Sequence, residues 1–255
     1  MTDHPIIMSA PMVQALRAGR KTQTRRVLAR SNTMLDGWPW SREDWAGRDW
    51  QWQDSWVDSG PSPAGNPGPY LKVPDKSQDT VHRVYPRIAP DDRMWVRETW
   101  SCLATGVWSI ADARRNCDPG NIIFAADGAR GVKWWPSIFL PREFSRTTLT
   151  VTAVRFEHLQ DICREDAIAE GLACVSKDGG RTWKYGIPDS DGEPGNDDHG
   201  WPWDEWETDP RRAFHKLWDR IHAGTDHIWK NNPLVIPYTF HVSDRNIDRV
   251  RSSRT

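Results

Sequence analysis

A short basic stretch near the N-terminus constrains this chain more than any other feature. Residues 19–26 read Gly-Arg-Lys-Thr-Gln-Thr-Arg-Arg, with a lysine, three arginines, two threonines and no acidic residue. Such a concentration of positive charge, with hydroxyl groups inside it, suits an anionic or polar ligand better than a hydrophobic core. The competing interpretation is a solvated basic strand at the edge of a sheet.

The residues before this stretch predict a short helix. Ser9 is a plausible N-cap, and Gly19 fits the position just after a helix end. The apolar residues recur at helical spacing and are Met12, Val13 and Leu16. The basic stretch therefore begins where a helix stops.

A strand is expected next, from Thr22 to Leu28. Thr24 and Arg26 are two residues apart and share one face of that strand. Lys21 reaches the same side only if it lies in the turn before the strand, or if the strand contains a bulge. A common pocket for these residues depends on that geometric condition.

Later elements follow a mixed pattern of helices and strands. We expect strands over 93–100, 147–156 and 234–242, and helices over 161–171 and 209–224. Glu170 falls in the last turn of the helix that Gly171 ends, where the helix dipole opposes a negative charge. A carboxylate so placed is either exposed and harmless or suited to act as a general acid. Arg97 and Glu98 lie inside the first strand, where charged residues are either salt-bridge partners or part of a pocket.

Two stretches rich in tryptophan interrupt this pattern. Residues 30–90 contain six tryptophans between Trp38 and Trp56, followed by a Gly/Pro-rich run, and residues 176–209 include nine acids from Asp189 onward with no lysine or arginine after that point. The tryptophans either cover the core or stack on nucleic-acid bases. We expect a single α+β domain over 1–255 with two long irregular insertions and a flexible basic tail over 245–255.

Composition argues against several classes of protein. No apolar run approaches the ~20 residues of a membrane helix, and the first residues do not resemble a signal peptide, so we expect a cytoplasmic protein without a membrane partner. The four cysteines show no paired spacing, which predicts free thiols in a reducing compartment. We expect neither a metal nor a cofactor, because no zinc-binding spacing occurs. The net charge of −1 argues against a bulk nucleic-acid coat protein; the oligomeric state stays open.

The basic stretch resembles the Gly-x-Lys-x-x-Thr-x-Arg signature of the ASCH domain family, with Gly19, Lys21, Thr24 and Arg26 in the matching places. The strand over 95–100, the helix before residue 171 and the terminal helix–strand pair follow in the family's order. Residues 134–142 are similar to the larger, phage-borne members. The resemblance implies a small PUA-like β-barrel of about five or six strands with two or three helices. It also implies a phage or prophage protein that acts in the cytoplasm of a bacterial host.

Some ASCH proteins are amidohydrolases that remove the acetyl group of N4-acetylcytidine with a lysine, a threonine and a glutamate. Position by position, the resemblance assigns these catalytic roles to Lys21, Thr24 and Glu170. A threonine hydroxyl becomes a nucleophile when a neighbouring base takes its proton, and a lysine with a lowered pKa can be that base. The glutamate then protonates the leaving amino group of cytosine.

The remaining candidates are charged residues that would bind substrate. They are Arg20, Arg25, Arg26, Arg97 and Glu98. The first three would also lower the pKa of the neighbouring lysine. Arg26 or a backbone N–H would stabilise the oxyanion.

Three interpretations therefore compete. The first is a hydrolase acting on a modified nucleoside, most simply an N4-acylated cytosine. The second is a non-catalytic module, or a ribonuclease, that binds RNA or modified nucleic acid, with affinity falling steeply with salt. The third is an interaction protein whose exposed tryptophans bind a partner.

Overall fold

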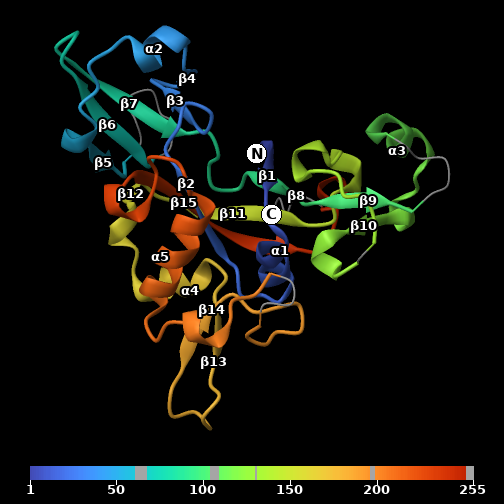
Figure 1. The fold of residues 1–255 in the computed structure, drawn as a ribbon. Helices are drawn as coiled ribbons and strands as arrows, with labels where there is room; N and C mark the ends of the chain where they lie inside the picture. Colours follow the sequence, from blue (N-terminus) through green and yellow to red (C-terminus); the bar gives the residue numbers. More distant parts are fainter. Residues whose placement is uncertain (61–67, 104–108, 130, 196–198, 251–255) are drawn as a thin grey trace.

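The computed structural model describes residues 1–60, 68–103, 109–129, 131–195 and 199–250, and places smaller lobes around a central sheet (Figure 1). The α-helices are α1 (Ala10–Arg17), α2 (Arg42–Ala46), α3 (Ile110–Asn116), α4 (Arg164–Ala169) and α5 (Pro210–Ile221). The strands are β1 (Asp3–Ile7), β2 (Gln23–Val27), β3 (Thr33–Leu35), β4 (Trp38–Pro39), β5 (Trp56–Asp58), β6 (Tyr70–Asp75), β7 (Thr80–Pro86), β8 (Arg93–Arg97), β9 (Trp100–Cys102), β10 (Ile122–Phe124), β11 (Thr148–Val154), β12 (Glu157–His158), β13 (Ala173–Val175), β14 (Lys184–Gly186) and β15 (Leu234–Ser243).

The central sheet is open. Its strand order is β1-β8-β11-β15-β12, and β2 also pairs with β15. The pair β1–β8 is parallel and the other pairs are antiparallel. Within the residues that the structure describes, β1 pairs only with β8, and β2 and β12 pair only with β15, so the two ends of the sheet do not meet. The α+β class is confirmed, but the described strands do not form the expected closed barrel.

The helices and strands expected around the basic stretch are confirmed. α1 ends before Gly19, whose φ of 72° is left-handed, and β2 follows. α4, α5, β8 and β15 lie where the sequence pattern predicts them. β11 contains a register shift between Val151 and Ala153, which is the mark of a β-bulge.

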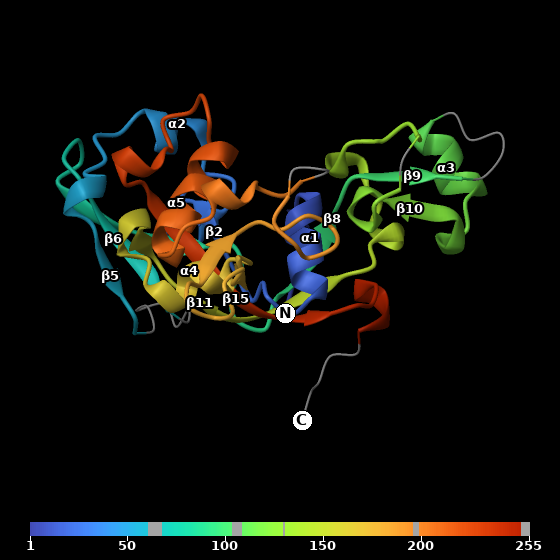
Figure 2. The same cartoon turned by 60° about the horizontal axis from the view of Figure 1, so that its bottom comes forward.

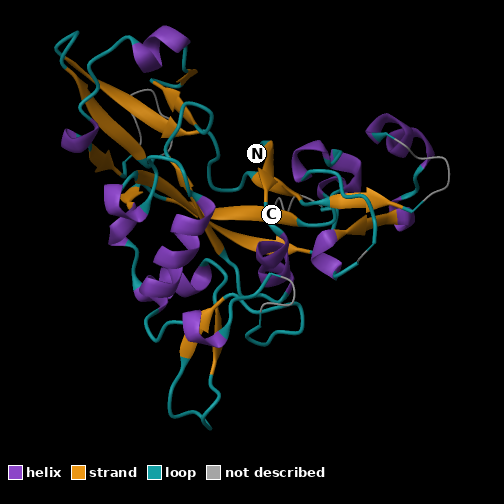
Figure 3. Ribbon diagram, viewed as in Figure 1, coloured by secondary structure: helices purple, strands orange, loops and turns teal. Residues whose placement is uncertain are grey.

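The first insertion is an ordered sheet, so the expectation of an irregular segment is wrong. Its strands have the antiparallel order β4-β3-β7-β6-β5 (Figure 3). The pair β6–β7 buries Leu71, Val73 and Val84. Four of its tryptophans pack on each other and on the core, namely Trp40, Trp45, Trp50 and Trp52, with Trp40 edge-on to Trp45 at a ring distance of 4.8 Å. Trp38 and Trp56 are exposed. The insertion forms a sheet because apolar residues recur in it at strand spacing, despite its Gly/Pro-rich run.

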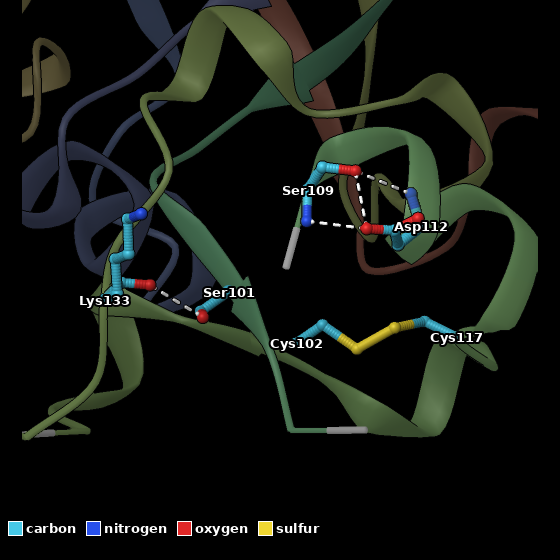
Figure 4. Close-up of a disulfide and its surroundings, with 6 residues drawn as sticks. All are labelled: Ser101, Cys102, Ser109, Asp112, Cys117 and Lys133. Atoms are coloured by element: carbon cyan, nitrogen blue, oxygen red, sulfur yellow. Dashed lines mark hydrogen bonds between the residues drawn. A yellow bond between two sulfur atoms is a disulfide. The ribbon is translucent and has the colours of Figure 1, made fainter. Parts of the chain in front are cut away.

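A lobe built from residues 99–140 carries a disulfide. β9 pairs with β10, and α3 packs on them around Trp100. Cys102 and Cys117 are joined, with their Cα atoms 6.8 Å apart (Figure 4). The expectation of four free thiols is therefore wrong for this pair. The helix α3 brings Cys117 close to β9, and no sequence motif indicates a pairing across this 15-residue separation. Disulfides are rare in cytosolic proteins, so the cytoplasmic location stays a prediction.

The second insertion packs on α5 through β14, and Tyr185 of β14 contacts Arg164 of α4. β13 and β14 lie at the bottom of the view in Figure 1. Figure 2 shows the first insertion and the lobe with α3, β9 and β10 on opposite sides of the molecule. β14 pairs with β13, and Trp201 and Trp206 are buried in the same hydrophobic cluster as the central sheet. Part of the expected flexible tail is also packed, because Ile247 is buried and Arg93 donates a 3.0 Å hydrogen bond to its carbonyl. Residues 251–255 lie outside the described residues. Among those that are described, no helix is both long and apolar enough to cross a membrane.

Candidate functional site

A pocket of about 410 Å³ opens beside β2. The end of β1, the start of α1, the loop after β2 and one side of α5 form its walls. The charged and hydroxyl residues that β2, the chain just before β2 and the end of α4 contribute are Lys21, Thr24, Arg25, Arg26 and Glu170. The three residues to which the family resemblance assigns catalysis therefore line one cavity, together with two of the five proposed substrate-binding residues.

Lys21 reaches this pocket because it precedes the strand. It forms an isolated bridge with Glu170, and β2 begins two residues later at Gln23. The geometric condition set by the sequence is thus met by a turn. Gly171 makes the close approach possible: its φ is +109°, and a Cβ there would lie 3.2 Å from the Lys21 Cβ. A side chain at Gly171 would push the end of α4 away from the lysine.

Lys21 and Glu170 form a buried ion pair. The Lys21 Nζ donates to the Glu170 carbonyl oxygen at 2.7 Å and to its Oε2 at 2.9 Å. The other carboxylate oxygen accepts from Arg25 at 3.0 Å. Glu170 therefore lies between two cations, and Lys21 contacts one carboxylate.

Burial sets the protonation of the lysine. Lys21 is only 2% exposed, and the loss of water lowers its pKa below the ordinary value. Glu170 opposes this shift, while the positive charges of Arg26 and Arg25 add to it. A lysine in these surroundings yields a neutral amine more readily than an exposed one. Burial lowers the pKa of Lys21 more than the arginines do, although the sequence points to the arginines.

Thr24 and Arg26 face the pocket with few competing contacts. The Thr24 hydroxyl forms no hydrogen bond with any residue that the structure describes. Arg26 donates to the Ile7 carbonyl at 2.8 Å and makes no ion pair with the described residues. Burial lowers the pKa of Arg26, and the negative charge of Glu170 partly offsets this shift. A cation without a carboxylate partner at a pocket wall favours an anionic or strongly polar ligand group.

Arg25 is held mainly by protein carboxylates. Its Nε donates to Glu157 at 2.9 Å, and its two terminal nitrogens bond Asp166 at 2.9 Å and Glu170 at 3.0 Å. Gln23 accepts a further bond at 2.5 Å. With these donors occupied, Arg25 fixes Glu170 and the end of α4 more than it binds a ligand.

The other three charged candidates lie outside the pocket. Arg20 precedes Lys21 but does not line the cavity. Arg97 lies over the ring of Trp95 at 4.4 Å. Glu98 is 1% exposed and is bound by both ends of the Arg146 guanidinium, at 2.8 and 2.9 Å. The last two are structural contacts of β8 and the neighbouring lobe.

Sequence reasoning missed the wall contributed by α5. Phe214, Trp218 and His222 are spaced four residues apart and all line the pocket. His222 stacks on Trp218 at 4.2 Å, and burial lowers its pKa. Their i, i+4 spacing places them along one side of α5 and was the available signal.

No protein-family model, curated protein or solved structure matches the chain. Within the described ranges, no group of three or more His, Cys, Asp or Glu side chains is placed to hold a metal ion.

Proposed function

We propose that this protein is an ASCH-type hydrolase that cleaves the amide bond of an N4-acylated cytosine nucleoside. The observation that carries the proposal is a single pocket lined by Lys21, Thr24 and Glu170. Burial lowers the pKa of the lysine, as a general base for a threonine nucleophile requires. The match of Lys21 and Thr24 to the ASCH signature supports the same assignment.

In the first half-reaction the neutral Lys21 amine takes the proton of the Thr24 hydroxyl. The Thr24 oxygen bonds to the acyl carbon, and the carbonyl oxygen becomes an oxyanion. Collapse of this intermediate breaks the bond between the acyl carbon and N4. The proton passes from Lys21 to N4, so cytidine leaves and the acyl group stays on Thr24 as an ester.

In the second half-reaction water replaces the nucleoside. Lys21 accepts a proton from that water, whose oxygen attacks the ester carbon. The acid is released and Thr24 regains its proton. Covalent catalysis of this kind divides one difficult substitution into two easier steps.

Glu170 and the arginines support these steps. The 2.9 Å contact between Lys21 Nζ and Glu170 Oε2 gives the transferred proton a path through the carboxylate to the leaving nitrogen. Arg25 keeps that carboxylate in place through its 3.0 Å bond. Arg26, which has no carboxylate partner among the described residues, is the side chain best suited to the oxyanion.

Mass spectrometry of N4-acetylcytidine incubated with the purified protein tests the proposal. We expect conversion to cytidine and acetate by the wild type, and loss of that conversion in Thr24→Val and Lys21→Met. Thr22→Val is the matched control, because Thr22 is exposed and lies outside the pocket. An acetyl adduct on the Thr24 peptide would identify the ester. Absence of conversion by the wild type at high enzyme concentration would refute the hydrolase.

The second candidate is a binding module for modified nucleic acid. It is favoured by Glu170, whose two carboxylate oxygens already accept hydrogen bonds from Lys21 and Arg25, as expected of a carboxylate with a structural role. Phosphate contacts release counterions, so this function predicts an affinity for RNA that falls linearly with salt on a logarithmic scale. Salt-independent affinity would count against it.

A further inference from the structure

A second pocket, of about 260 Å³, adjoins the first. Val27 and His227 line both pockets and stand between them. The second pocket is bounded by the first insertion on one side and by the end of β2 and the start of β15 on the other. Its remaining lining residues are Leu28, Trp45, Trp52, Gln53, His158, Asn232, Pro233 and Leu234.

Two indole rings from the insertion shape this second pocket. Trp45 and Trp52 lie 5.5 Å apart between ring centroids, tilted by 42°. Trp40 contacts both rings, at 4.8 and 6.4 Å, and fixes their orientation. Both indoles are partly exposed, so the pocket offers an apolar, aromatic wall to a ligand rather than a filled core. Flat ring systems stack favourably on such walls.

A few polar groups accompany the aromatic wall. The carbonyl of Asn232 can only accept, so the 3.2 Å contact with His158 Nδ1 places the proton of the neutral ring there and leaves Nε2 as an acceptor. Gln53 is exposed and adds an amide. An apolar pocket with a small number of hydrogen-bonding groups suits a planar heterocycle, and its volume lies just below the range of about 300–1,000 Å³ for drug-sized ligands.

The strand β2 connects the two pockets. Thr24 lines the first and Leu28 the second, and four residues of strand span about 13 Å. Arg30 and Lys230 are exposed, and neither forms an ion pair with the described residues. Arg30 stands in the chain between two residues of the first pocket, and Lys230 lies two residues before Asn232 of the second. Both cations are thus available to a phosphodiester that joins the sites.

We propose that the second pocket holds a nucleobase adjacent to the acylated cytosine, so that the substrate is a single-stranded oligonucleotide rather than a free nucleoside. This inference rests on the proposed function for the first pocket. The separation of the pockets requires the two bases to be unstacked and splayed, which is how proteins read single strands. The Trp45/Trp52 wall supplies the stacking energy, and Arg30 and Lys230 supply the charge complementarity.

Fluorescence anisotropy with a short unmodified RNA that contains one cytidine tests the second pocket apart from hydrolysis. Removing the bases that flank the cytidine, to leave abasic sugars, should weaken binding to the wild type by about 5- to 150-fold, since one stacked base is worth ~1–3 kcal/mol. Trp52→Ala should weaken binding of the intact RNA by a similar factor and Trp52→Phe by much less. Trp56→Ala is the matched control, because Trp56 is 47% exposed and lies outside both pockets.

Equal affinity for intact and abasic RNA would overturn the second base site, and that comparison uses only the wild type. A parallel assay compares kcat/KM for N4-acetylcytidine and for the acetylated RNA, with the RNA expected to be preferred by at least tenfold. Equal kcat/KM with base-independent binding would refute the second site and leave the hydrolase standing. Base-dependent binding without hydrolysis of either compound would refute the hydrolase and support the second site.

Discussion

Replacing Glu170 by glutamine isolates the ion pair on which the proposed chemistry depends. Among the described residues, Glu170 is the one carboxylate that contacts Lys21. The glutamine keeps the backbone carbonyl that accepts from Lys21 at 2.7 Å but leaves the ammonium unpaired at a site that is 2% exposed. Breaking a buried pair in this way typically costs about 3–5 kcal/mol. At ~2–4 °C per kcal/mol for a chain of about this size, the melting temperature should fall by about 6–20 °C.

Lys21→Met should cost less than Glu170→Gln. Glu170 then keeps its 3.0 Å bond from Arg25, and methionine fills the apolar volume of the lysine stem. The loss is about one or two charged hydrogen bonds, of which each is worth ~1.5–3 kcal/mol before the relief of burying an ammonium is subtracted. The double variant, which combines Lys21→Met with Glu170→Gln, should be more stable than Glu170→Gln alone, because it removes the unpaired charge.

The loss in free energy of unfolding caused by Glu170→Gln should shrink as pH rises. The pKa of Lys21 in the folded protein lies below 10.5, the ordinary value that applies in the unfolded chain. Between the two pKa values the unfolded chain binds more protons than the folded protein, so the free energy of unfolding rises with pH. Glu170 raises this pKa through its charge and its hydrogen bond, and the variant loses both effects. Its lysine therefore becomes neutral at a lower pH, which relieves the unpaired charge.

Urea unfolding followed by tryptophan fluorescence, from about pH 6 to about pH 9, measures these differences. Additive losses in the double variant would refute the reasoning, because they would mean that the two side chains do not interact. A deficit that stays constant with pH would mean that the cost comes from packing and not from the buried ammonium.

Three further outcomes are expected. Thr24→Val should abolish hydrolysis yet change the free energy of unfolding by less than about 1 kcal/mol, because its hydroxyl bonds no described residue; a large loss of stability would show a structural role. Gly186→Ala should lower the free energy of unfolding by about 1–3 kcal/mol, since its Cβ would lie 2.5 Å from the Trp206 ring, whereas Gly120→Ala meets no atom within 4 Å and should be near neutral. Cys117→Ser should destabilise the lobe by about 3 kcal/mol, as expected for a 15-residue loop, and a reductant should erase the difference from the wild type if the disulfide is its cause.

Local patterns in the sequence were enough to place the elements around the site. Helical spacing and the glycine at position 19 fix the end of α1, and the alternation of apolar residues fixes β15. The same local reasoning defined the condition under which Lys21 shares a pocket with Thr24. These features depend on residues within one or two turns of each other, where side-chain periodicity and backbone preference decide the conformation.

Contacts between distant segments were decided only in the tertiary structure. The sheet stays open because β1 pairs with β8 whereas β2 pairs with β15. The pairing of Cys102 with Cys117 depends on how the chain folds between these two residues. The carboxylate partners of Arg25 lie more than 130 residues away, on β12, in α4 and at the end of α4. The sequence by itself determined which residues carry charge, hydroxyl and aromatic groups, and which local elements hold them. Burial of Lys21, the α5 wall and the second pocket beside the tryptophans arise only when those elements pack, since desolvation and cavity shape are properties of the packed molecule.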